Sequence, residues 1–124
     1  MLKVLVVAED HNLRFAVSRI LGDHGFDVVT AANGDRGVFL FDREIPDFVI
    51  MDVTVTPEHD GIAITEKMRS LCPRARIIGL SRPGLSGLDP EQAALILGMD
   101  ELIAKPVDPD ELLHCVGQLR LAPA

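Results

Sequence analysis

The chain alternates between two patterns of apolar residues along its whole length. Short segments rich in Val, Ile and Leu predict strands. The run from Val4 to Val7 is apolar on consecutive positions, as a strand covered on both faces of a sheet requires. Longer segments carry apolar residues at helical spacing. The predicted strands are residues 3–8, 26–30, 48–51, 76–80 and 102–104.

A helix is predicted after each strand, from apolar residues on one face and from residues that favour helix ends. The first helix begins near Asn12, and Gly25 can end it. Asn33, Asp89 and Asp108 are the predicted N-caps of the second, fourth and fifth helices. The residues predicted to face inward are Leu13, Ala16, Val17, Ile20 and Leu21, then Val38, Phe41 and Ile45, then Ile64, Met68 and Leu71, and finally Leu112, Val116 and Leu119.

Strict alternation of five strands and five helices implies one parallel sheet with helices on both faces. The length of 124 residues suits a single domain with one continuous core. We expect this domain to span residues 1–121, and residues 122–124 to form a tail or the start of a linker.

Charge and cysteine content narrow the possible functions. Twelve Lys and Arg against 19 Asp and Glu give a formal charge of −7, and this charge disfavours direct binding to nucleic acid or to an anionic membrane. The sequence has neither an apolar run long enough to span a membrane nor a signal-peptide pattern. Cys72 and Cys115 lie outside any metal-binding or redox motif, and we interpret them as buried thiols in a reducing compartment. These features predict a cytoplasmic domain.

Polar residues collect where the predicted strands end. In doubly wound sheets the ligand crevice lies beyond the carboxyl ends of the strands. Carboxylates in one crevice repel one another unless a cation lies among them, and Mg²⁺ prefers oxygen ligands. With an ammonium and a hydroxyl nearby, such a carboxylate can act as a nucleophile toward phosphorus. The residues at these strand ends are Glu9, Asp10, Asp52, Ser81, Arg82 and Lys105.

Several segments together resemble the receiver domains of bacterial two-component response regulators. Residues 3–10 are similar to the first strand and acidic cluster of this family, and residues 46–52 to its phosphoacceptor strand. The resemblance covers essentially the whole chain in the family's order and spacing. The other matching segments are Pro57 with Asp60 and Gly61, Leu80 with Ser81, and residues 98–106.

The resemblance implies a flavodoxin-like α/β fold, with strand order 2-1-3-4-5 in a three-layer sandwich. It implies that Asp52 accepts a phosphoryl group from a histidine kinase or phosphotransfer protein, and that Ser81 and Lys105 hold the phosphoryl oxygens. Mg²⁺ would be held by Glu9, Asp52 and the backbone carbonyl of Thr54. The bond between Lys105 and Pro106 is expected to be cis.

The resemblance also implies a role as a switch rather than as an enzyme. Phosphorylation would reshape the face formed by the fourth helix, the fifth strand and the fifth helix. That face would then bind a downstream protein, a fused effector domain or a second copy of the chain.

Four positions depart from the family pattern. Ala8 stands where an aspartate is usual, and Glu9 is one methylene longer than the usual ligand, so Asp10 becomes a further candidate for the metal site. Arg82 occupies a position that is usually small, and we expect it to pair with the acceptor carboxylate or with its phosphoryl group. Leu102 stands where many members have an aromatic ring that moves inward on activation.

Two other functions stay open. A degenerate receiver would bind a protein without taking phosphate, with Arg82 acting as a permanent counter-charge. A flavodoxin-like cofactor binder is disfavoured because the chain has no Trp or Tyr to stack on a ring and because acidic groups would repel a phosphate. Of the histidines, His59 alone has a claim on the site, and Met51, Met68 and Met99 are expected in the core.

Overall fold

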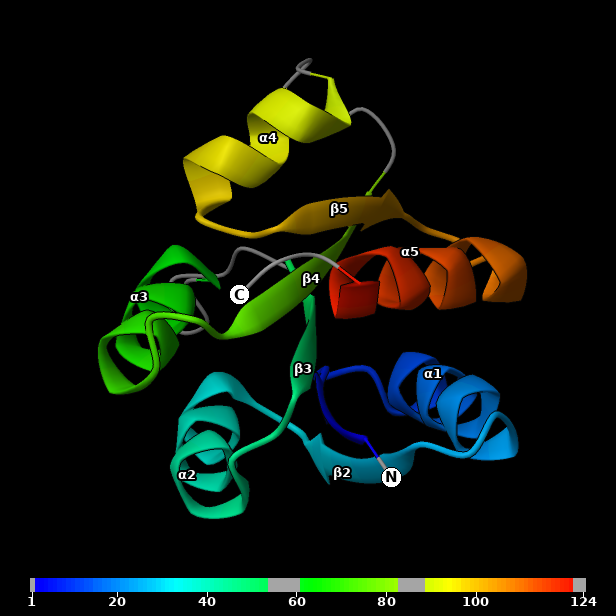
Figure 1. Cartoon of the computed structure of the whole chain (residues 1–124), viewed down its shortest axis with the longest axis horizontal. Coiled ribbons are helices and arrows are strands. Elements are labelled where there is room, and N and C mark those ends of the chain that lie inside the picture. The colour runs from blue at the N-terminus through cyan, green and yellow to red at the C-terminus, as the bar shows by residue number, and fades with distance from the viewer. Residues whose placement is uncertain (1, 54–60, 83–88, 122–124) are drawn as a thin grey trace.

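The computed structural model describes residues 2–53, 61–82 and 89–121. Within these residues strands and helices alternate in the predicted order (Figure 1). The strands are β1 (Lys3–Val7), β2 (Asp27–Ala31), β3 (Phe48–Asp52), β4 (Arg76–Ser81) and β5 (Glu101–Ala104). The helices are α1 (His11–Asp23), α2 (Gly34–Glu44), α3 (Gly61–Leu71), α4 (Pro90–Leu97) and α5 (Pro109–Leu121).

All the strands pair in parallel in one sheet, with the order β2-β1-β3-β4-β5. The carboxyl ends of β1, β3, β4 and β5 therefore lie side by side at one edge. This arrangement confirms the predicted doubly wound architecture and its strand order. The residues that lie opposite one another on adjacent strands nearest that edge are Val7 and Met51, Asp52 and Leu80, and Ser81 and Ala104.

Helices cover both faces of the sheet, so the core has two layers (Figure 1). Helices α2, α3 and α4 cover one face, where Phe41 and Met68 pack against Leu5 of β1. Helices α1 and α5 cover the other face, where Leu21 and Leu112 belong to the buried cluster. Because successive side chains of a strand point to opposite faces, the consecutive apolar residues of β1 serve both layers.

The helix ends follow the residues that favour them. Asn33 Oδ1 accepts the backbone N–H three residues later at 2.8 Å, and Asp89 Oδ1 does the same at 3.0 Å. Asp108 Oδ1 accepts the backbone N–H two residues later at 2.9 Å. Gly98 ends α4 in the left-handed conformation, with φ 75°. The predicted caps are therefore confirmed.

Three residues predicted to face the core are exposed instead. Ile45 is 78% exposed because α2 ends at the preceding residue and Ile45 takes the left-handed C-cap conformation, with φ 48° and ψ 63°. Leu71 is exposed because it is the last residue of α3, and Ala16 is exposed on α1. Cys115 is buried as predicted, but Cys72 is only half-buried.

A smaller difference concerns the limits of one strand. β2 spans Asp27–Ala31, one residue later than predicted. The three methionines expected in the core, Met51, Met68 and Met99, are buried. No helix in the described ranges combines the length and the apolar character needed to cross a membrane.

Candidate functional site

Asp52 is the last residue of β3, and the four residues before it in this strand are buried. Its Oδ1 atom lies 2.7 Å from Nζ of Lys105, which directly follows β5. The two side chains are 7% and 28% exposed, respectively. An ion pair that is this short and largely shielded from solvent is stronger than a surface pair. The structure thus brings together two of the predicted site residues from separate strands.

Ser81 ends β4, the strand between those that carry Asp52 and Lys105. Its side chain is buried, and its carbonyl accepts a hydrogen bond from the Lys105 N–H at 2.7 Å. Beyond the end of β3, the Val53 N–H donates to the Leu80 carbonyl at 2.8 Å. These main-chain bonds hold the carboxylate, the hydroxyl and the ammonium on neighbouring rigid strands.

The carboxyl end of β1 carries two acids that the structure uses differently. Asp10 is the N-cap of α1, and its Oδ1 accepts the N–H groups of Asn12 and Leu13 at 2.8 and 3.2 Å. Glu9 is exposed, and Ala8 beside it is buried. Asp10 therefore completes a helix start, and Glu9 is the other carboxylate at this strand end.

Arg14 is a residue that sequence reasoning missed. Its Nη1 donates to the carbonyls of Ala8 and Glu9, at 2.8 and 3.4 Å, and its Nη2 lies 3.2 Å from Nδ1 of His11. The guanidinium therefore braces the main chain between β1 and α1. The sequence does contain a signal for this role. The helix dipole disfavours a cation in the first turns of a helix, so an arginine there is expected to have another partner.

Arg82 follows Ser81 and is exposed. Among the residues that the structure describes, Arg82 forms no ion pair, and the contact predicted for it with the acceptor carboxylate is made by Lys105. Thr54 and His59 lie outside the described residues.

Leu102 in β5 is half-buried and packs against the core layer beneath α4. A Cβ atom added to Gly79 would lie 2.8 Å from Leu102 Cδ1 and 2.4 Å from Met99 Sδ, so these side chains fill the space over β4. Leu102 is therefore already directed inward. The peptide bond between Lys105 and Pro106 is cis, the isomer that the resemblance implies.

The oxygen ligands of the crevice determine which metal could bind. Among the described residues there is no group of three or more His, Cys, Asp or Glu side chains placed to hold a metal ion. Glu9 and Asp52, however, lie at the carboxyl ends of the paired strands β1 and β3. Mg²⁺ typically takes one or two carboxylates and keeps several waters. These two residues therefore fit Mg²⁺ in ligand type and number.

The fold and the edge residues define a flavodoxin-like α/β domain with a charged crevice at the carboxyl ends of its strands. The family model of the response regulator receiver domain matches residues 4–117. The chain belongs to this family, and it is a receiver domain of two-component systems.

Individual relatives agree with this assignment over nearly the whole chain. Chemotaxis protein CheY of Bacillus subtilis (strain 168) is 32% identical over 117 residues, which cover 94% of this chain and 95% of the relative. Sporulation initiation phosphotransferase F of the same organism is 31% identical over 114 residues, with coverage of 92% and 90%. A chain of the CheX-CheY-BeF3-Mg+2 complex from Borrelia burgdorferi is 27% identical with a TM-score of 0.83, covering 98% of this chain and 90% of that one.

Proposed function

We propose that this receiver domain accepts a phosphoryl group on Asp52 from a phosphohistidine of a partner kinase or phosphotransfer protein. The observation that carries the proposal is the 2.7 Å ion pair between Asp52 and Lys105 at the carboxyl edge of the sheet. A shielded carboxylate held in one orientation by a cation is a nucleophile in a defined position.

The attacking group is the Asp52 carboxylate, which pairs with Lys105 through Oδ1. The new bond joins a carboxylate oxygen to phosphorus while the bond between phosphorus and the imidazole nitrogen of the donor breaks. The electron pair of that bond leaves with the imidazole, and Asp52 neither gains nor loses a proton. In such transfers, positioning and charge neutralisation supply most of the rate enhancement.

Glu9, Asp52 and the backbone carbonyl of Thr54 would hold Mg²⁺. The bound ion would neutralise part of the charge on the phosphoryl oxygens. Asp10 is left out of this set because its Oδ1 atom already accepts two backbone N–H groups. Lys105 and the Ser81 hydroxyl would bind phosphoryl oxygens directly.

The phosphoryl group adds about 1.5 to 2 negative charges near neutral pH. It would attract Ser81, Arg82 and Lys105, which lie at the ends of β4 and β5. Their displacement would alter the face formed by α4, β5 and α5, where a downstream protein would bind. Because Leu102 already packs inward, the change would pass through the main chain of β4 and β5 rather than through this side chain. We place this exchange in the cytoplasm.

Intact-mass spectrometry tests the proposal. The protein is incubated with phosphoramidate, a small donor with a phosphorus–nitrogen bond, with and without MgCl₂. We expect one added phosphoryl group in the wild type, none in Asp52→Asn, and one in Asp42→Asn, which changes an exposed aspartate of α2. No added mass, or an equal gain in Asp52→Asn, would overturn the proposal. The first of these results would favour a domain that binds its partner without phosphorylation.

A further inference from the structure

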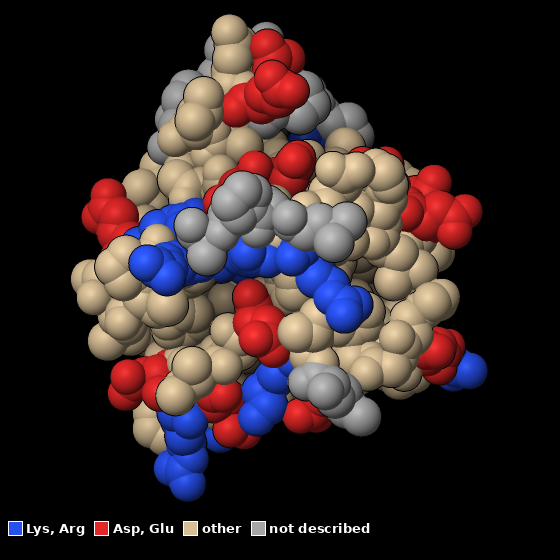
Figure 2. All heavy atoms as spheres, viewed as in Figure 1, with Lys and Arg blue, Asp and Glu red and all other residues tan. Residues whose placement is uncertain are grey.

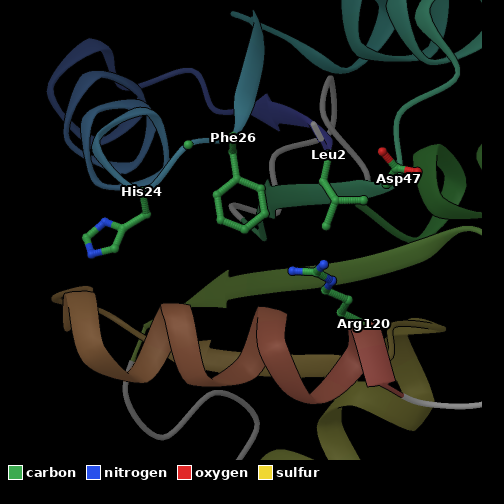
Figure 3. A pocket seen from close by; sticks show the side chains of 6 residues that line it. Leu2, His24, Phe26, Asp47 and Arg120 are labelled. Atoms are coloured by element: carbon green, nitrogen blue, oxygen red, sulfur yellow. The ribbon is translucent and has the colours of Figure 1, made fainter.

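A separate cavity lies at the opposite edge of the sheet (Figure 3). Its volume is about 400 Å³, within the range of small-molecule sites. Its lining residues precede β1, β2 and β3 or belong to the last turn of α5, so the full lengths of β1 and β3 separate it from Glu9 and Asp52. The lining residues are Leu2, His24, Gly25, Phe26, Asp47 and Arg120.

Two apolar side chains form a fixed surface in this cavity. Leu2 and Phe26 are partly buried, and both pack against the core layer beneath α1 and α5. Figure 3 shows the Arg120 side chain reaching from α5 toward these two residues. Arg120 is exposed and has no ion-pair partner among the described residues. Its guanidinium therefore presents donors next to an apolar surface.

The other polar lining groups are already engaged. Asp47 Oδ2 accepts the Lys3 N–H at 2.8 Å, which ties the amino ends of β1 and β3 together. His24 Nδ1 lies 2.8 Å from the carbonyl oxygen of Ile20. The Asp47 carboxylate forms no ion pair with Arg120 in the described part of the chain. The lining therefore carries one acid, Asp47, and one arginine, Arg120, which are not paired with each other, so an anionic group would bind at the guanidinium.

Positive charge extends beyond the cavity. Figure 2 shows Lys and Arg side chains gathered in a band across one face of the molecule. Arg76 donates to the carbonyl of Leu119, the residue before Arg120, and Arg69 donates to the carbonyl of Ala75 at 2.6 Å. Arg69 also pairs with Asp100 at 3.1 Å, whereas Arg120 has no ion-pair partner in the described part of the chain. In a protein with a formal charge of −7, Arg120 is therefore the local positive charge that would attract an anion to the cavity.

We propose that the cavity binds a small organic anion. A carboxylate or phosphate group would pair with the Arg120 guanidinium, whose fork matches either group in a bidentate arrangement. The apolar body of the ligand would lie against Phe26 and Leu2. This site does not depend on the function proposed for Asp52, because the two lie at opposite edges of the sheet.

An NMR titration of ¹⁵N-labelled protein tests the site with four probes. Phenylacetate and phenyl phosphate share a ring and differ in their anionic group, 2-phenylethanol lacks the charge, and inorganic phosphate lacks the ring. We expect saturable shifts at the amides of Leu2, Gly25 and Phe26 with at least one aromatic anion. Binding of the neutral alcohol and of inorganic phosphate should be at least about fivefold weaker. The tighter of the two aromatic anions identifies the anionic group.

Matched arginine variants locate the charge. Arg120→Gln should weaken binding of the tighter anion about tenfold. Arg74→Gln removes an exposed arginine from the turn before β4 and should leave binding unchanged. The proposal is overturned if neither aromatic anion gives saturable shifts, if 2-phenylethanol or inorganic phosphate binds as tightly, or if Arg120→Gln binds like the wild type. Both side chains are exposed, so amide spectra away from the cavity should show that each variant stays folded.

Discussion

Replacing Lys105 by Met removes the ammonium next to Asp52 and keeps most of the aliphatic side chain. The acceptor carboxylate, which is 7% exposed, then loses the cation that lies 2.7 Å from its Oδ1 atom. A shielded carboxylate is costly when its counter-charge is removed. We therefore expect Lys105→Met to lower the free energy of unfolding.

The size of the effect follows from the geometry of the pair. At 2.7 Å the Coulomb energy is about 6 kcal/mol for an effective dielectric constant of about 20, and desolvation of both groups offsets most of it. Removing one partner of a fully buried pair costs about 3–5 kcal/mol, whereas an exposed pair contributes about 0.2–1 kcal/mol. Because Lys105 is 28% exposed, we expect a loss of about 2 kcal/mol. This loss corresponds to a decrease in Tm of about 6–10 °C.

Urea unfolding of the wild type, Lys105→Met, Asp52→Asn and the double variant forms a double-mutant cycle. Asp52→Asn should restore most of the stability lost in Lys105→Met, with a coupling energy of about 1–3 kcal/mol. Lys67→Met changes an exposed lysine of α3 and should stay within about 0.5 kcal/mol of the wild type. A coupling energy within about 0.3 kcal/mol of zero would refute this reasoning.

Four further substitutions test other parts of the structure. Gly79→Ala should lower the free energy of unfolding in urea by about 1–3 kcal/mol, because the added Cβ would lie 2.4 Å from the sulfur of Met99. The control Gly117→Ala in α5 should not destabilise the protein, because its Cβ would meet no atom within 4 Å. Asp10→Ala should cost about 1 kcal/mol through the lost N-cap, whereas Asp10→Ser should retain most of the stability; equal losses would contradict the capping role. Ile45→Gly should raise Tm, because a left-handed conformation costs a residue other than glycine about 1–2 kcal/mol, and an unchanged Tm would count against strain there. Burial, with smaller contributions from nearby acids, raises the pKa of the Cys115 thiol to about 12. Because the folded state holds this proton more tightly than the unfolded chain, stability should fall from the ordinary thiol pKa toward pH 12, and Cys115→Ala should remove that part of the pH dependence measured by unfolding.

The order of elements could be predicted because the central strands are apolar on both faces and the helix starts carry capping residues. The apolar runs of β1 and β3 and the capping residues Asn33 and Asp89 reflect local preferences that the folded structure retains. Ile45 could not be assigned in this way. Its spacing continues the apolar stripe of α2, but the helix ends at the preceding residue, ahead of a proline. The spacing of apolar residues predicts which side chains face the core only for residues that lie within the helix.

The meeting of Asp52, Ser81 and Lys105 follows from topology, because each lies at or just beyond the end of a strand in one parallel sheet. Which cation pairs with the carboxylate does not follow. Arg82 and Lys105 both come directly after strands, and their spacing in the sequence favours neither. In the structure the partner of Asp52 is Lys105. The backbone N–H of Lys105 donates to the Ser81 carbonyl at 2.7 Å, and this bond holds the lysine next to Asp52.

The acids of the crevice show why residue type alone overstates the number of oxygen ligands available to a metal ion. Glu9 and Asp10 are adjacent in the sequence, and each is a plausible oxygen donor. The N–H groups at the start of α1 have no partner within the helix, and Asp10 satisfies two of them. Arg14 also donates to the carbonyls of Ala8 and Glu9, which precede this turn, and so holds the backbone that carries both acids. Since Ala8 contributes no carboxylate, Glu9 and Asp52 are the carboxylates left to bind a cation in the crevice. The charge of Asp52 is already partly balanced by Lys105.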